Sequence, residues 1–167
     1  SPAGADRLEI DATTALGTDR EAFLAVWAEE RARQFREEVP RFREVDLAVR
    51  LRRVLARLRG SDQPPEDGAW DDAAAAARST TAEIEGALAV YADAFAAAIP
   101  PDPAVGDLLE RLAPRYRLGI LSNWPLAAAI DTYVVAAGWA PHLAAVVVSE
   151  RVGAIKPHPA IFRAAER

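Results

Sequence analysis

Two short apolar segments near the end of the sequence constrain the fold most. RLGILS ends at Ser122, and AAVVVS covers residues 144–149. The second segment has no polar alternation, which is typical of a strand covered on both faces in a parallel sheet. Between them, residues 126–138 predict a helix that ends at a glycine. Because parallel strands are joined by a crossover that is usually helical, the sequence predicts a βαβ unit and an α/β fold.

The first hundred residues carry a different pattern, in which apolar side chains recur at helical spacing. The predicted helices cover 19–38, with Thr18 or Asp19 as N-cap, then 46–58 and 70–77, and a longer helix capped by Thr81. In the first helix we expect one shared apolar face, made by Phe23, Val26, Trp27 and Phe35. The proline-rich and acidic residues 61–68 predict a loop. Together these helices predict a small antiparallel bundle.

The pattern changes at Pro100, where we place a domain boundary. A helix over 101–115 opens with PDP, and its apolar stripe is expected to face inward through Val105, Leu108, Leu109 and Leu112. We therefore expect an N-terminal helical domain resembling a four-helix bundle over 1–99 and an α/β domain over 100–167.

Composition narrows the classes of function. The formal net charge is −5, and the basic residues are scattered among acids, which argues against nucleic acid as a partner. No apolar run approaches the ~20 residues that span a bilayer, and no signal-peptide pattern is present. The sequence has no cysteine, hence no disulfide and no thiolate metal site. These features predict a cytoplasmic protein, and no pattern indicates the oligomeric state.

Three polar residues follow the two predicted strands. Ser122 and Asn123 end the first strand, and Lys156 follows the second after 156 − 122 = 34 residues, about one crossover. Because ligands bind at the carboxyl ends of parallel strands, a hydroxyl, an amide and an ammonium there predict an anion site. Trp124 is placed to line it. Taken singly, Ser122 is more typical of a turn or cap and Lys156 of a solvated loop, and Trp124 is equally typical of packing; it is their combination at neighbouring strand ends that favours the site.

These segments resemble a known superfamily. LGILSNWP and GAIKPHPAIF resemble the second and third motifs of the haloacid dehalogenase-like hydrolases, and PDPAVGDLLERLAPRYRLGIL resembles the run before the second motif. The helical segment before Pro100 resembles that superfamily's cap. The resemblance implies a partial Rossmann-like parallel sheet with an N-terminal α-helical cap domain.

The resemblance also implies roles and an activity. Ser122 matches the hydroxyl that hydrogen-bonds the transferring phosphoryl oxygen, and Asn123 matches its substrate-facing neighbour. Lys156 matches the lysine that steadies the nucleophilic aspartate and the developing charge. The implied enzyme is a hydrolase with an aspartyl intermediate; we favour a magnesium-dependent phosphatase of a small phosphorylated metabolite over a metal-free 2-haloacid dehalogenase.

Two of the superfamily's motifs have no match. The nucleophile motif, D-x-D-x-T, is absent, and Asp11 in LEIDATTALG is only a superficial match. The acidic pair that binds magnesium is expected beyond Arg167, and Asp71 and Asp72 are interpreted as a solvated helix start. We therefore expect a fragment of a longer parent chain, without metal ligands of its own and without turnover of p-nitrophenyl phosphate.

Other classes remain open. Phosphoaspartate receiver domains also place a hydroxyl and a Lys-Pro at neighbouring strand ends, but at a shorter interval and without a helical cap. A non-catalytic interaction module with a degenerate α/β half is a further alternative. A dinucleotide site is excluded because the sequence lacks G-x-G-x-x-G. We interpret His142 as a surface loop residue and His158 as part of a helix start.

Overall fold

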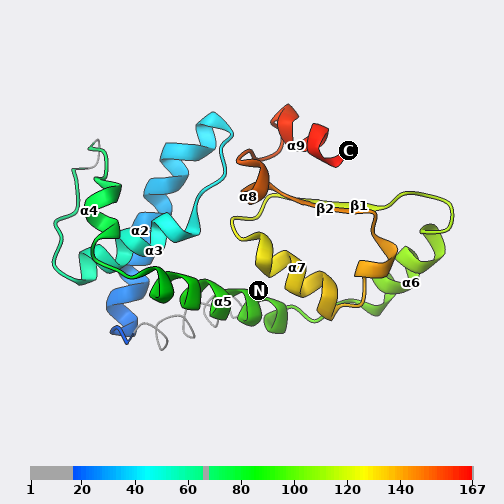
Figure 1. The fold of residues 1–167 in the computed structure, drawn as a ribbon, viewed down its shortest axis with the longest axis horizontal. Helices are drawn as coiled ribbons and strands as arrows, with labels where there is room; N and C mark the ends of the chain where they lie inside the picture. Colours follow the sequence, from blue (N-terminus) through cyan, green and yellow to red (C-terminus); the bar gives the residue numbers. More distant parts are fainter. Residues whose placement is uncertain (1–16, 66–67, 167) are drawn as a thin grey trace.

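The predicted strand–helix–strand unit is present in the computed structural model, which describes residues 17–65 and 68–166. β1 (Gly119–Ser122) and β2 (Ala145–Val148) form a parallel pair, and α7 (Ala127–Ala136) is the crossover between them (Figure 1). Within the described ranges this pair is the whole sheet, and the rest of the regular structure is helical. The α/β class is therefore confirmed at this coarse level.

Helices lie on both sides of the strand pair. Figure 1 shows α7 on one side and α8 (Ser149–Val152) with α9 (Pro159–Ala165) on the other. Val148 at the end of β2 and Ile161 of α9 are both fully buried. Coverage from two sides explains why AAVVVS has no polar alternation.

The segment before Pro100 is helical, as predicted. Its elements are α2 (Arg20–Glu38), the short 3-10 helix η1 (Val39–Arg41), α3 (Leu47–Leu58), α4 (Asp72–Ala76) and α5 (Thr81–Ala98). Asp19 caps α2, as expected, because its carboxylate accepts from the Ala22 N–H at 2.8 Å. The prediction that Thr81 caps α5 is wrong: Thr80 is the cap, in a capping box with Glu83, and Thr81 is the first helical residue.

The buried face of α2 differs from the predicted one. Phe23 and Trp27 are buried, but Phe35 is 42% exposed and lies under the Arg31 guanidinium, 5.1 Å from the ring centroid. The buried positions continue instead through Glu30 and Gln34. Phe35 follows Gln34 and is therefore turned about 100° away from the core.

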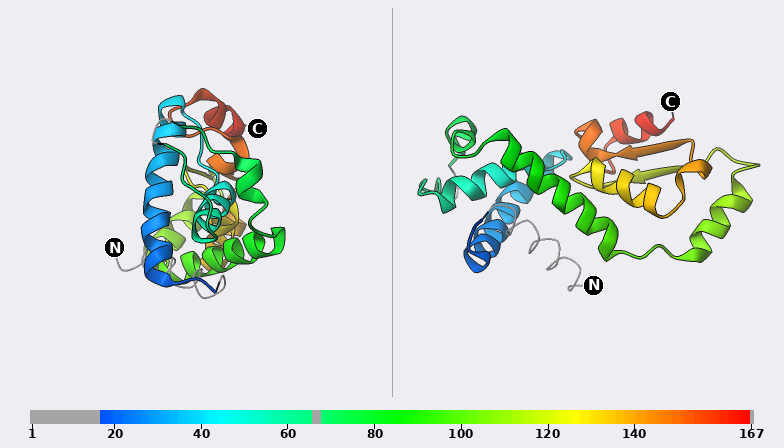
Figure 2. Two further views of the ribbon diagram at one scale, coloured as in Figure 1. Left: turned by 90° about the vertical axis from the view of Figure 1, so that its left-hand side faces the viewer. Right: turned by 60° about the horizontal axis from the view of Figure 1, so that its bottom comes forward.

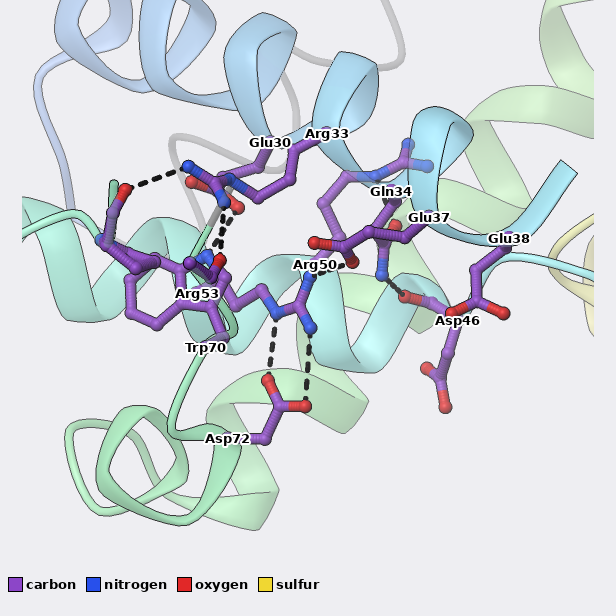
Figure 3. A network of polar contacts seen from close by, with 12 residues as sticks. Glu30, Arg33, Gln34, Glu37, Glu38, Asp46, Arg50, Arg53, Trp70 and Asp72 are labelled. Carbon is purple, nitrogen blue, oxygen red and sulfur yellow. Dashed lines mark hydrogen bonds and ion pairs between the residues drawn. The ribbon is translucent and has the colours of Figure 1, made fainter. Parts of the chain in front are cut away.

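Polar side chains continue the core where α2, α3 and the loop before α4 meet (Figure 3). The side chain of Arg53 is 9% exposed and pairs with Glu37 at 3.0 Å and with Asp72 at 2.8 Å. Burial lowers the pKa of the Arg53 guanidinium, but the hydrogen bonds to Asp72 and Glu37 outweigh this and raise that pKa. Asp71 caps α4, as expected for a helix start. Asp72 has a role beyond that of a solvated residue, because its carboxylate accepts a hydrogen bond from the buried Arg53 guanidinium.

A second set of contacts in Figure 3 holds the described parts of the loop before α4, residues 61–65 and 68–70. Glu30 is fully buried and accepts from Arg57 at 3.0 Å and from the Trp70 indole N–H at 3.0 Å. Arg33 donates to backbone carbonyls of the same loop, those of Pro64, Pro65 and Gly68. Buried Glu30 is therefore paired with Arg57, and buried Arg33 is hydrogen-bonded, which are the conditions under which a buried charge is tolerated.

One apolar core crosses the proposed boundary at Pro100. Phe95 of α5 packs against Trp124 at 4.8 Å and against Tyr133 of α7 at 6.2 Å, measured between ring centroids. Leu126 and Ala129 belong to the same buried cluster as the helices before Pro100. The two-domain division remains a prediction, and the structure adds that its halves share this core.

The inward orientation predicted for the apolar stripe on α6 (Pro103–Leu112) is wrong for Leu108, whereas Val105, Leu109 and Leu112 are half-buried. The helix forms where expected, with Asp102 as its cap, but none of its residues is buried and Leu108 is 45% exposed. Figure 2 shows α6 at one end of the molecule, apart from the helices that cover the strands. An apolar stripe is fully buried only where a second surface covers it, and the described residues cover α6 only in part.

No helix in the described ranges has the length and apolarity needed to cross a membrane.

Replacing Phe95 tests the shared core. Phe95→Ala removes a buried ring that joins α5 to Trp124 and Tyr133, so we expect a loss of about 3–5 kcal/mol in the free energy of unfolding. Urea denaturation measures it. Phe162→Ala, at a ring that is 43% exposed, is the matched control and should cost less than about 1 kcal/mol. Equal losses in the two variants would contradict a shared core.

The capping box of α5 predicts an acid-shifted titration. Hydrogen bonds from Arg59, the Thr80 N–H and the Thr80 hydroxyl lower the pKa of Glu83 from 4.5 to about 2. The stabilisation is therefore complete above pH 4.5 and is lost as the pH falls toward 2. Carboxyl ¹³C NMR should show Arg59→Ala raising the Glu83 pKa toward 4.5, whereas Arg117→Ala leaves it in place. An unshifted midpoint in Arg59→Ala would rule out this origin of the low pKa.

Candidate anion-binding site

The carboxyl ends of β1 and β2 lie side by side, which brings the predicted site residues together. Ser122 ends β1 opposite Val148 of β2. Asn123 follows Ser122, and Lys156 lies in the loop between α8 and α9. The parallel register therefore places the two loops next to each other, as the spacing of 34 residues between Ser122 and Lys156 predicts.

The side chain of Asn123 joins these loops. Its Oδ1 accepts from the Lys156 backbone N–H at 2.7 Å, and its Nδ2 donates to the Lys156 carbonyl at 3.3 Å. An amide side chain can satisfy both groups of one peptide residue in this way because it carries a donor and an acceptor. The resemblance implies that the backbone of Asn123, and sometimes its side chain, faces the substrate; the structure shows the side chain holding Lys156, and the substrate-facing role remains a prediction.

Lys156 is the single lysine in the sequence, and its ammonium lies at the end of β1. Nζ donates to the Leu121 carbonyl at 2.7 Å, one residue before Ser122. An ammonium has three N–H donors, and the remaining two make no hydrogen bond within the described ranges. The side chain is half-buried, so water screens its charge only in part. Lys156 is therefore a cation held in place by one hydrogen bond, and its two remaining N–H donors can bind a ligand.

Ser122 is the least committed member of the site. It is half-buried, and its hydroxyl has no hydrogen-bond partner among the residues that the structure describes. A hydroxyl at this position can donate to an anion beside the Lys156 ammonium. With the described residues, the Ser122 hydroxyl makes none of the hydrogen bonds that a turn or cap role would involve.

Trp124 packs on the helical core. Its ring lies 4.8 Å from that of Phe95, and its indole N–H is buried without a hydrogen-bond partner in the described part of the chain. The packing alternative for Trp124 is therefore realised, and its predicted role in lining the pocket remains a prediction.

Ser149 is a site residue that the sequence analysis missed. It is fully buried, its Oγ accepts from the Trp124 backbone N–H at 2.8 Å, and its hydroxyl hydrogen-bonds the carboxylate of Glu44. The available signal was a polar residue ending the apolar run AAVVVS, which we assigned to the strand. Its neighbour Glu150 accepts from the Ala127 N–H at 3.4 Å, where α7 begins.

A segment from the helical part of the chain also supports the Lys156 loop. Arg43 and Ala154 form an isolated antiparallel bridge, and the Ile155 N–H donates to the Phe42 carbonyl at 3.0 Å. The loop that carries Lys156 is therefore held on one side by Asn123 and on the other by residues 42–44.

The described residues do not fit magnesium. Mg²⁺ takes carboxylate and other oxygen ligands, whereas the site offers a hydroxyl, an engaged amide and a cation. In the described ranges no group of three or more His, Asp or Glu side chains could hold a metal ion. His158 also has another role, the predicted one at a helix start: its Nδ1 accepts from the Ala160 N–H at 3.1 Å. Asp11 lies outside the described residues.

No protein-family model matches the chain, and a search of curated proteins found no significant match. A functional assignment must therefore start from the motifs and the geometry of the site.

The two hydrogen bonds between the Asn123 side chain and the Lys156 backbone predict a measurable contribution to the free energy of unfolding. Asn123→Ala removes two partly exposed hydrogen bonds, and we expect it to lower the free energy of unfolding by about 1–2 kcal/mol. Urea denaturation measures the change, with Gln63→Ala in the exposed 61–68 loop as the control that should be near neutral. A neutral Asn123→Ala would show that the amide does not secure the Lys156 loop.

Proposed function

We propose that this chain belongs to a haloacid dehalogenase-like hydrolase that acts on a small phosphorylated metabolite. Three features support the proposal: the two motif resemblances, the parallel strand pair with its helical crossover, and the helical segment before it. In this proposal the strand pair is part of a Rossmann-like sheet, and α2 to α5 form the helical cap. The order of the elements along the chain agrees with both.

One observation carries the proposal. The Lys156 ammonium is anchored by a single bond to the Leu121 carbonyl, and the adjacent Ser122 hydroxyl is uncommitted among the described residues. A phosphoryl group placed there would accept from the hydroxyl and from the remaining ammonium protons. Such preorganised donors stabilise the charge that develops on a transferring phosphoryl group.

The residues of the site have different roles in this proposal. Ser122 and Lys156 bind the anion, and Asn123 keeps the Lys156 backbone in register through its two hydrogen bonds. The superfamily's attacking group is an aspartate, and no described residue at these strand ends supplies one. We therefore propose only the anion-holding part of the mechanism for these residues and route no step through a metal ion.

The same donors would also suit the carboxylate of a 2-haloacid. The motifs do not separate the two activities, because dehalogenases share the serine, asparagine and lysine. A phosphorylated metabolite remains our choice because a phosphoryl dianion carries more charge to match Lys156 than a carboxylate does.

Lys156 offers a direct test because it is the single lysine in the sequence. Growth on ¹³C,¹⁵N-lysine therefore labels Lys156 alone and leaves its three N–H donors intact. Titration with inorganic phosphate at constant ionic strength should shift the Lys156 Cε and Nζ signals saturably. Ser122→Ala should weaken the affinity about tenfold, the worth of one hydrogen bond to a charged group. Ser61→Ala, in the 61–68 loop, is the matched control and should bind like the unsubstituted chain.

Two results would count against the proposal. Linear, unsaturable shifts with phosphate would refute an anion site and favour the non-catalytic alternative. Tighter binding of 2-chloropropionate than of phosphate would replace the phosphatase proposal with the dehalogenase one.

A further inference from the structure

Glu44 extends from the connection between η1 and α3 to the turn that follows β1. Its carboxylate accepts from the hydroxyl of Ser149, 105 residues further along the chain. The Ser149 oxygen in turn accepts from the Trp124 N–H at 2.8 Å. Trp124 is the second residue after Ser122. A carboxylate of the helical part is therefore connected to the anion site through one buried hydroxyl.

The connection from Glu44 to Trp124 depends on which acceptor receives the hydrogen bond from the Ser149 hydroxyl. Its hydroxyl has one proton and two nearby acceptors: the Glu44 carboxylate, and the Trp124 carbonyl at 3.3 Å. A charged carboxylate is the stronger acceptor, so the proton goes to Glu44. The Ser149 oxygen is then free to accept from the Trp124 N–H, and Ser149 is fully buried, so water offers that N–H no substitute.

Both oxygens of the Glu44 carboxylate are engaged. Oε2 accepts from Ser149, and Oε1 accepts from the Val45 N–H at 2.8 Å. The backbone of Glu44 also donates to the Gly153 carbonyl at 3.4 Å, beside the bridge between Arg43 and Ala154. One three-residue segment, 42–44, therefore holds both the turn after Ser122 and the loop before Lys156.

We propose that Glu44 is a positioning residue for the anion site. Through Ser149 it fixes the Trp124 backbone and with it the orientation of Ser122 and Asn123 toward Lys156. The proposal rests on the proposed function, since it assigns a role in anion binding. It also implies that a displacement of residues 42–44 relative to β2 lowers the affinity for phosphate.

Glu44→Gln is the most direct variant. Glutamine has the same shape, but its single amide oxygen cannot accept from both Ser149 and Val45. Ser149→Ala removes the same connection at its midpoint and serves as a second variant if the first fails to fold. The matched control is Glu38→Gln in the same stretch of chain, whose carboxylate pairs with Arg43 at 2.6 Å and has no contact with Ser149.

Two measurements follow the connection. Labelling with ¹⁵N-tryptophan gives four backbone amide signals, and Trp124→Phe identifies the one at residue 124. Hydrogen exchange at that amide should be at least about tenfold faster in Glu44→Gln and in Ser149→Ala, while the other tryptophan amides are unchanged. Phosphate affinity, followed by the Lys156 Cε and Nζ signals, should fall about three- to tenfold in both variants and stay constant in Glu38→Gln.

A double-mutant cycle separates positioning from general destabilisation. Because Glu44 and Ser149 act in one chain of hydrogen bonds, Glu44→Gln combined with Ser149→Ala should bind phosphate no more weakly than Ser149→Ala alone. Additive losses would overturn the proposal, as would faster Trp124 exchange with unchanged phosphate affinity. If the unsubstituted chain fails to bind phosphate, the proposed function falls, and the exchange rates alone decide whether Glu44 holds this turn.

Discussion

The parallel register of β1 and β2 is the constraint on which the rest of the site depends. Ser122 lies opposite Val148, so the residues after both strands emerge at the same edge. A slip of one residue would turn Ser122 to the opposite face of the sheet. It would also separate Asn123 from the Lys156 backbone and Trp124 from the Ser149 hydroxyl. The pairing is short, four residues in each strand, and polar side chains reinforce it where it ends.

Those side chains fall into two groups. Asn123 and Ser149 are engaged within the protein: the first bonds to both backbone groups of Lys156, and the second connects Trp124 to Glu44. Ser122 and the Lys156 ammonium retain donors that the described residues do not use. Engaged side chains supply rigidity and uncommitted donors supply affinity, which is the division expected of a preorganised binding site.

Local signals in the sequence predicted most of the elements. Both strands, the crossover helix and the cap at Asp19 follow from apolar period and capping chemistry within a few residues. The errors have tertiary causes. We expect Phe35 and Leu108 to face the core, and both are exposed, because whether an apolar face is covered depends on surfaces that lie far away in the sequence.

The site was predictable only in part for the same reason. Strand ends and spacing indicated that Ser122, Asn123 and Lys156 share one edge, because the βαβ topology requires it. Nothing local indicated that the Asn123 amide would serve the Lys156 backbone. The bond between Glu44 and Ser149 spans 105 residues and depends on how the helical part is placed on the strands.

A crystal structure of the chain grown with tungstate, a tetrahedral dianion that scatters strongly, tests the central claim most directly. The proposed site predicts one tungstate at the carboxyl end of β1, with its oxygens within about 3 Å of Ser122 Oγ and Lys156 Nζ. The Asn123 amide should still hold the Lys156 backbone in that structure. Tungstate bound elsewhere, or a Lys156 ammonium turned away from the Leu121 carbonyl with no anion beside it, would contradict the account.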